Sequence, residues 1–304
     1  MTTPGAPAAT GSAAGAPVID AHQHFWDLSA HDQPWLRSDP ELFPLLRTFT
    51  PADLAPLAAA AGVTATVVVQ TVHEPWETPE LLALAAGAGP VAGVVGWADL
   101  TAPGVADVLA ELPELPGGDR LVGIRHGVLV EPDPGWLSRP DVLRGLAAVA
   151  AAGLAYDIVG APRHLPAAVT AAGRLPQLTF VLDHLGNPDP GPGTSPAASE
   201  PWASAVTGFA ALPNTTAKLS GILGVPPPPG TAPGSVAHLR PYYDFVLHAF
   251  GPNRLMFGSD WPTCTLEASY AQVCAAAQSL TAGLSAAEQE AIFCRTARRA
   301  YRLR

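Results

Sequence analysis

Short runs rich in valine, isoleucine and leucine alternate along the chain with longer stretches rich in alanine and leucine. Several short runs are apolar throughout, such as Val67-Val68-Val69 and Phe180-Val181-Leu182. Continuous apolar strands are typical of a parallel sheet buried on both faces, whereas an antiparallel sandwich would alternate apolar and polar residues. The pattern predicts eight strands, near residues 17–21, 65–70, 91–97, 121–126, 154–159, 178–183, 215–220 and 254–259.

The stretches between the strands carry helix-start signals. Thr50-Pro51-Ala52-Asp53 supplies a cap, a proline in the first turn and an early acid. Ser285-Ala286-Ala287-Glu288 reads as a capping box. Further helices are predicted near residues 79–87, 103–111, 140–152, 163–173, 201–211, 236–250 and 266–280. The alternation predicts an α/β protein, either a closed (β/α)₈ TIM barrel or a doubly wound open sheet.

Three segments depart from this rhythm. Residues 1–16 consist mainly of Ala, Gly, Pro and Thr and are predicted to form a disordered low-complexity tail before a single barrel domain at 17–304. Residues 187–200 and 223–234 follow strands six and seven, so they are predicted to be long loops on the face where barrel enzymes keep their sites. They act as rims or lids, or they are tolerated insertions.

Composition narrows the class of protein. The chain has 304 residues, of which 48% are hydrophobic, and a formal net charge of -10. Without basic clusters, and without an uninterrupted apolar run long enough to span a bilayer, nucleic-acid and membrane partners are not expected. Cys264, Cys274 and Cys294 are odd in number and lack paired spacing, which argues against a disulfide framework. We expect a cytoplasmic monomer or homodimer that acts on a small-molecule substrate.

Candidate chemistry gathers at the predicted strand ends. His22 and His24 follow the first apolar run, and a strand side chain returns to the same face every second residue, so both imidazoles point to one place. Asp260 follows the last strand, which favours closure of the sheet because ligands on the first and last strands then become neighbours. Other strand ends carry Gln70, Asp99, Arg125, His126, Asp157, Asp183, His184, Lys218 and Ser220.

Together these residues resemble the amidohydrolase superfamily, in particular its branch of sugar-lactone hydrolases. The resemblance runs from about residue 17 to the C-terminus. It is carried by Ile19-Asp20-Ala21-His22-Gln23-His24-Phe25-Trp26, Gly123-Ile124-Arg125-His126, Leu182-Asp183-His184-Leu185-Gly186-Asn187-Pro188, Lys218-Leu219-Ser220-Gly221 and Met256-Phe257-Gly258-Ser259-Asp260-Trp261-Pro262. It implies a barrel that hydrolyses a cyclic ester, with His22, His24, His184 and Asp260 at its centre.

The chain departs from the two-metal members of the superfamily. Those members supply a bridging carboxylate or carbamylated lysine from strand four and histidines from strands five and six, whereas strand four here ends in Arg125 and His126 and strand five offers only Asp157. One divalent ion, most simply zinc, held by His22, His24 and Asp260 would keep an open position for water. The alternative is a metal-free site in which the same residues polarise the carbonyl directly.

The resemblance implies roles for individual residues. Asp260 is the general base, and His184 orients water or donates the final proton. Arg125 and His126, with the His22/His24 pair, are predicted to hold the carbonyl oxygen of the substrate. Arg125, His126 and Lys218 are predicted to bind substrate.

Each of these residues also has a structural alternative. Asp260 could cap a helix, and His184 could be a buried histidine. Arg125 could pair with Asp157 or Asp183, and Lys218 could be a structural ion-pair partner.

Trp26 and Trp261 are predicted to be flat walls for a sugar ring, or else core aromatics. The remaining histidines are predicted to lie on the surface or on helices: His31, His73, His164, His238 and His248.

The leading hypothesis is hydrolysis of an aldonolactone such as L-fuconolactone or L-rhamnonolactone. Two alternatives stay open. One is another reaction on the same barrel, either amide hydrolysis or decarboxylation of an unsaturated acid. The other is a non-catalytic barrel that binds a sugar or a metal.

Overall fold

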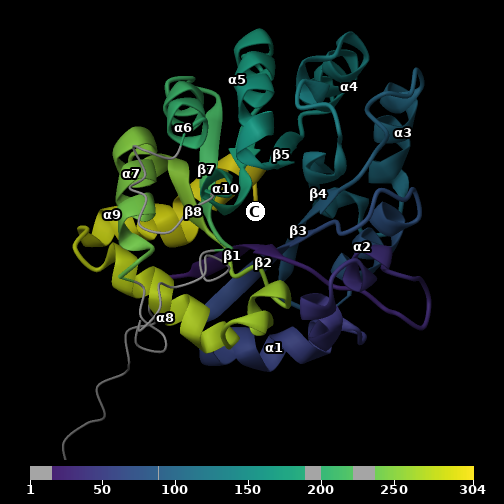
Figure 1. Cartoon of the computed structure of the whole chain (residues 1–304). Helices are drawn as coiled ribbons and strands as arrows, with labels where there is room; N and C mark the ends of the chain where they lie inside the picture. The colour runs from purple at the N-terminus through teal and green to yellow at the C-terminus, as the bar shows by residue number, and fades with distance from the viewer. Residues whose placement is uncertain (1–15, 88, 189–199, 222–236) are drawn as a thin grey trace, which may run out of the picture.

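A computed structural model describes residues 16–87, 89–188, 200–221 and 237–304. Its eight parallel strands are hydrogen-bonded in chain order, with the helices placed around them (Figure 1). The strands are β1 Val18–Gln23, β2 Val63–Val69, β3 Val91–Gly96, β4 Leu121–Gly127, β5 Ala155–Val159, β6 Phe180–Leu182, β7 Thr215–Leu219 and β8 Leu255–Phe257. The predicted TIM barrel is confirmed. Almost all of the predicted tail, most of the loop 187–200 and all of the loop 223–234 lie outside the described residues.

The barrel closes between the first and the last strand. Just beyond β8, the backbone N–H of Asp260 donates to the carbonyl of His22 at 2.8 Å, and the N–H of His24 donates to the carbonyl of Trp261 at 2.7 Å. These bonds place the exits of β1 and β8 side by side. An open sheet, the competing architecture, would have left these two segments at opposite edges.

The helices follow the predicted positions within a few residues. They are α1 Pro51–Ala60, α2 Glu77–Ala85, α3 Val105–Glu111, α4 Pro140–Ala151, α5 Leu165–Arg174, α6 Trp202–Ala210, α7 Arg240–Phe250, α8 Tyr270–Thr281, α9 Ala286–Glu290 and α10 Thr296–Tyr301. The predicted capping box at Ser285 is present, and Thr50, predicted as a cap, also forms a capping box with Asp53. Among the described residues, no helix is both long enough and apolar enough to cross a membrane.

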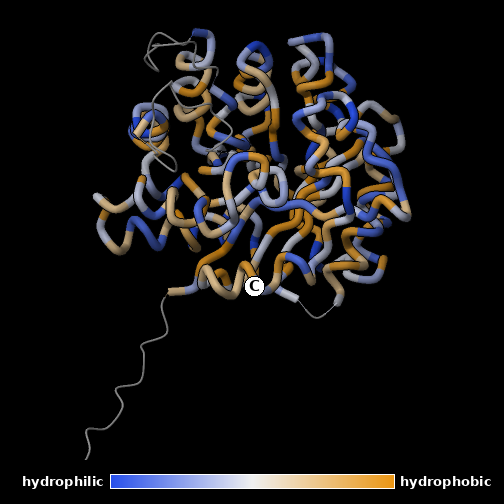
Figure 2. Tube along the Cα trace, turned by 60° about the horizontal axis from the view of Figure 1, so that its bottom comes forward, coloured by the Kyte–Doolittle hydropathy of each residue, from blue (hydrophilic) through white to orange (hydrophobic). Residues whose placement is uncertain are grey.

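Two hydrophobic layers explain why the strands are apolar on both faces. One layer lies between the strands and the helices, and Figure 2 shows the hydrophobic colour concentrated toward the interior. The other fills the barrel itself, with Ile19, Val67 and Met256 among its members. Tyr301 of α10 belongs to this inner layer, so the last helix covers one end of the barrel.

An irregularity in β1 directs its side chains. Asp20 pairs with Thr66 of β2 and Gln23 pairs with Val68, so three steps along β1 match two steps along β2. Such a bulge changes the face to which the following side chains point. Asp20 accepts a hydrogen bond from the Tyr270 hydroxyl of α8 at 3.0 Å, on the outside of the barrel. Beyond the bulge, His22 lies inside.

Gly258, just after β8, allows β1 and β7 to approach this point closely. A Cβ at Gly258 would lie 2.6 Å from the Cβ of His22 and 3.1 Å from that of Ser220. Both distances are shorter than ordinary van der Waals contact. A glycine is therefore needed here for packing around His22.

Replacing Gly258 with alanine is expected to lower the free energy of unfolding by about 1–3 kcal/mol, because the added methyl overpacks the site. Gly173→Ala is the matched control, since nothing lies within 4 Å of a Cβ built there in α5. It should leave stability unchanged or raise it by about 0.5–1 kcal/mol. Urea unfolding followed by circular dichroism measures both, and equal stability of Gly258→Ala and wild type would contradict the packing argument.

Candidate active site

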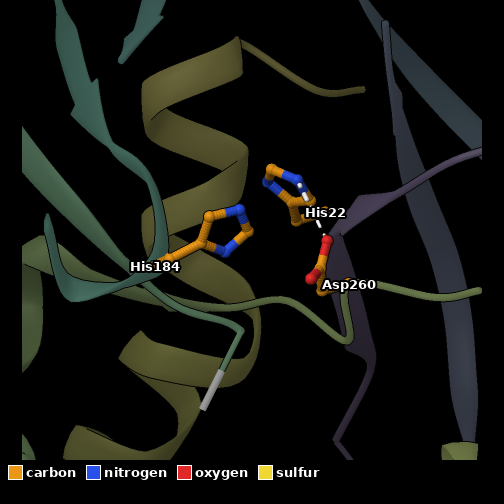
Figure 3. A group of neighbouring side chains, drawn as sticks. All are labelled: His22, His184 and Asp260. Atoms are coloured by element: carbon orange, nitrogen blue, oxygen red, sulfur yellow. Dashed lines mark ion pairs between the residues drawn. The ribbon is translucent and has the colours of Figure 1, made fainter. Parts of the chain in front are cut away.

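The structure brings the four central residues of the sequence prediction together at the exits of β1, β6 and β8. The Nε2 atoms of His22 and His24 lie 3.2 Å apart. Oδ1 of Asp260 lies 3.3 Å from Nε2 of His24 and 3.6 Å from Nε2 of His22. The ring centroid of His184 is 4.6 Å from that of His22. Figure 3 shows His22, His184 and Asp260 pointing toward one another.

His24 has a fixed tautomer. Its Nδ1 lies 2.7 Å from the carbonyl oxygen of Val69, which can only accept a hydrogen bond, so Nδ1 carries the hydrogen. In the neutral ring, Nε2 then presents a lone pair toward His22 and Asp260. This is the arrangement by which a backbone carbonyl orients a metal-binding imidazole.

His22 lies above a layer of buried charges. Its Nδ1 is 3.0 Å from Nζ of Lys218 and 3.3 Å from Oδ1 of Asp183. Burial, together with the positive charge of Lys218, lowers the pKa of His22 well below its usual value, so the ring is neutral. If Nδ1 donates to Asp183, Nε2 has a lone pair, which Nη1 of Arg125 faces at 3.4 Å. If instead Nδ1 accepts from Lys218, Nε2 carries the hydrogen and donates toward Asp260.

The charge layer is fully buried and paired. Nζ of Lys218 lies 2.6 Å from Oδ2 of Asp157 and 3.0 Å from Oδ1 of Asp183. The hydroxyl of Tyr301 donates to Oδ2 of Asp157 at 2.7 Å. Burial raises the pKa of Asp157 to about 6. Burial acts in the same direction on Asp183, but Lys218 and His22 outweigh it and hold the pKa of Asp183 well below its usual value.

Arg125 connects this layer to a pocket. Its Nη1 donates to Oδ2 of Asp183 at 3.1 Å, and its Nη2 donates to the side-chain oxygen of Gln70 at 3.2 Å. The open alternative for Arg125, pairing with Asp157 or with Asp183, is resolved in favour of Asp183. Arg125 lines a pocket of about 270 Å³ above the charge layer. Its described lining also includes His24, His184, Asp260, Leu129 and Val159.

Asp260 and His184 both have left-handed backbone conformations, with φ of 60° and 53°. Residues other than glycine rarely adopt such values, and they concentrate at functional sites. Burial would raise the pKa of Asp260, but His184, His24 and His22 outweigh it, so its pKa falls well below the usual value and the carboxylate is ionised. Nδ1 of His184 lies 3.0 Å from Oγ of Ser220, and burial lowers the pKa of His184.

Two residues predicted to bind substrate have structural surroundings instead. Lys218 is 0% exposed within the charge layer, and it does not line the described pockets. His126 has both nitrogens engaged, since Nδ1 accepts from Nε1 of Trp97 at 3.1 Å and Nε2 lies 2.7 Å from Oε1 of Glu131. Neither side chain is free to bind a ligand directly, because its polar atoms already have protein partners.

The two predicted aromatic walls lie in the core. The Trp26 ring packs against Trp35 and Phe49, and its Nε1 donates to the carbonyl of Arg47 at 2.7 Å. Trp261 is 2% exposed and packs against Phe49. Their surroundings match the alternative of core packing. Asp99, another strand-end residue, is exposed and accepts from the N–H of Thr101 within its own turn.

His73 was assigned to the surface or a helix by sequence, yet it lines the pocket. The signal that could have identified it is its position directly beyond Gln70, at the exit of β2. Glu131 and Tyr301 also contact the groups around the site and were not predicted. Glu131 caps the end of a short 3₁₀ segment that follows β4, and Tyr301 reaches the charge layer from α10. Neither lies at a strand end.

The donor set suits a divalent ion. The Nε2–Nε2 separation of 3.2 Å between His22 and His24 is close to the ~3.3 Å expected for two imidazole nitrogens about 2.0–2.1 Å from a tetrahedral zinc. His22, His184 and Asp260 form an overlapping set whose ligand atoms all lie within 4.8 Å of one another. The residues present could therefore hold one metal ion.

Comparisons with known proteins agree with this arrangement. A sequence model of the amidohydrolase family, described as Amidohydrolase, matches residues 19–303. An L-fucono-1,5-lactonase of Burkholderia multivorans is 38% identical over 293 residues, covering 95% of this chain and 97% of the relative. A second L-fucono-1,5-lactonase, from Burkholderia ambifaria, is 37% identical and covers 82% and 81% of the two chains.

A solved structure shows the same likeness in three dimensions. The crystal structure of an amidohydrolase from Burkholderia multivorans with bound Zn is 37% identical and aligns with a TM-score of 0.86, covering 95% of this chain and 100% of the other. With the matching sequence model and the curated relatives, this likeness shows that the chain belongs to the amidohydrolase family, in its fuconolactonase-like branch.

Proposed function

We propose that this protein hydrolyses L-fucono-1,5-lactone or a closely related sugar lactone, with Asp260 as the general base. The observation that carries the proposal is the convergence of an ionised Asp260 with His22 and His24 beside a pocket of about 270 Å³. The identity of 38% to an L-fucono-1,5-lactonase over almost the whole chain supports the choice of substrate. The substrate is thus a small molecule.

The first step needs a base held in its ionised form. Oδ1 of Asp260 faces the two imidazoles, which leaves Oδ2 to accept a proton from water. As the proton moves to Asp260, the water oxygen bonds to the lactone carbonyl carbon. A buried carboxylate with a depressed pKa stays ionised across the neutral range, so the proton-accepting form is present, and the same low pKa makes it a weak base that needs a closely held water.

The second step moves charge onto the carbonyl oxygen and then opens the ring. The guanidinium of Arg125 lines the pocket and supplies positive charge for the developing oxyanion. When the tetrahedral adduct collapses, the carbon–oxygen bond of the ring breaks. The leaving ring oxygen is protonated by the imidazole of His184 as that ring takes up the proton held by Asp260, so His184 passes a proton on and stays neutral. The product is an open-chain hydroxy acid.

A single divalent ion, proposed to be zinc, would be held by His22, His24 and Asp260. When bound, it would polarise the carbonyl and make a bound water more acidic. The described residues provide two imidazoles and one carboxylate, the kind of donor set that zinc accepts in catalytic sites.

Asp260→Asn is expected to lower kcat/KM for L-fucono-1,5-lactone by about 10²–10⁴-fold, since an amide cannot accept the proton from water. Asp107→Asn, an exposed carboxylate in the first turn of α3, is the matched control and should retain wild-type activity. A pH-indicator assay of acid release measures both. Activity of Asp260→Asn equal to wild type would remove this carboxylate from the mechanism.

Protein purified without chelator is expected to hold about one zinc per chain. His24→Ala should reduce the bound zinc by about tenfold or more, because it removes a ligand. His248→Ala, an exposed position on α7, should not change it. Elemental analysis by mass spectrometry after dialysis gives the metal content independently of activity. Full turnover after complete removal of metal would support the metal-free alternative instead.

A further inference from the structure

Four rings stack on one another beside the pocket, from the exits of β2, β3 and β4. The centroid of His73 lies 3.9 Å from that of His126 and 5.9 Å from that of Trp97, with interplanar angles of 23° and 10°. His126 in turn stacks on Trp136 at 4.2 Å. The stack fixes the plane of the His73 imidazole before any ligand arrives.

A backbone hydrogen bond fixes the tautomer of His73. The N–H of Gly127 donates to its Nε2 at 2.9 Å, so Nε2 carries no hydrogen. Burial, with the nearby His126 and Arg125, lowers the pKa of His73 to about 4, which keeps the ring neutral near pH 7. A neutral imidazole has one hydrogen, and here it must be on Nδ1.

This Nδ1–H has no hydrogen-bond partner among the described residues. It is not enclosed either, because the buried side-chain atoms that lack a partner do not include it. His126, the other imidazole of the stack, differs in this respect, since Trp97 and Glu131 engage both of its nitrogens. Only His73 of the pair has a donor to spare.

His73 lies where a substrate in the pocket could accept this hydrogen bond. His73 lines the pocket that contains Arg125 and Asp260, and it also lines an adjoining pocket of about 530 Å³. The loop that carries it is held by the buried carboxylate of Glu77, which accepts from the backbone N–H groups of Thr71 at 2.7 Å and Val72 at 3.1 Å. A pre-oriented donor on a fixed loop is the usual means of selecting a polar substrate group.

From this geometry we propose that His73 is a specificity-determining residue that donates a hydrogen bond from Nδ1 to one hydroxyl oxygen of the sugar lactone. His126, with Trp97 and Trp136, is the positioning support that holds the His73 ring in place. The inference rests on the proposed lactonase function and adds to it the residue that recognises a substrate hydroxyl.

The test pairs one variant with substrates that each lack one hydroxyl. His73→Phe keeps a flat ring in the stack and removes both nitrogens. Wild type and variant are assayed on L-fucono-1,5-lactone and on its 2-deoxy, 3-deoxy and 4-deoxy analogues. Wild type should lose about tenfold in kcat/KM on one of the analogues. His73→Phe should lose about tenfold on the parent lactone, yet it should open that one analogue about as well as wild type does.

A second variant separates donation from packing. In His73→Asn the amide nitrogen can occupy the place of Nδ1, so this variant should recover part of the lost activity on the parent lactone only. Thermal unfolding of each variant reports folding separately. The wild-type measurements do not depend on whether a variant folds. Equal wild-type rates on the parent and all three analogues would overturn the inference. A uniform loss of activity by His73→Phe on every lactone would overturn it as well. If wild type opens no lactone at all, the proposed function itself fails.

Discussion

The fully buried ammonium of Lys218 is the charge around which the site is organised. It contacts Asp157, Asp183 and His22 within 3.0 Å. Burying an unpaired charge costs several kcal/mol of desolvation free energy. Removing any partner of Lys218 would leave part of that cost uncompensated, so the partners are constrained to stay in contact with it. Arg125 pairs with the same Asp183 and extends the network to the pocket. With Asp260 counted, three carboxylates face two side-chain cations, and this excess of negative charge favours the binding of a further cation.

Asp183 and Lys218, the two partners of His22 Nδ1, determine which nitrogen of His22 carries the hydrogen. If Asp183 accepts a hydrogen from that nitrogen, Nε2 keeps a lone pair; if Lys218 donates to it, Nε2 becomes a donor. One tautomer thus leaves Nε2 able to bind the proposed metal ion, and the other does not. His24 has no such freedom, since the carbonyl of Val69 lies 2.7 Å from its Nδ1.

The sequence was sufficient for the barrel and for the convergence of four candidate residues, because both follow local rules. Apolar strands alternating with capped helices predict the architecture, and His22, His24, His184 and Asp260 are found together because parallel strand exits share one rim. The failures come from contacts that no local rule encodes. Whether His126 or His73 has a free nitrogen depends on the indole of Trp97 and on the N–H of Gly127. The aromatic ring of Trp26 suits either a pocket wall or the core, and only the positions of its neighbours show that it belongs to the core.

Tyr301 illustrates how far such contacts reach along the chain. Its hydroxyl donates to Asp157 inside the barrel, while its ring belongs to the inner hydrophobic layer that α10 completes. During synthesis on the ribosome, the polar interior formed by the earlier strands therefore has an unfilled position until residue 301 emerges. Completion of the native interior therefore waits until residue 301 has been translated.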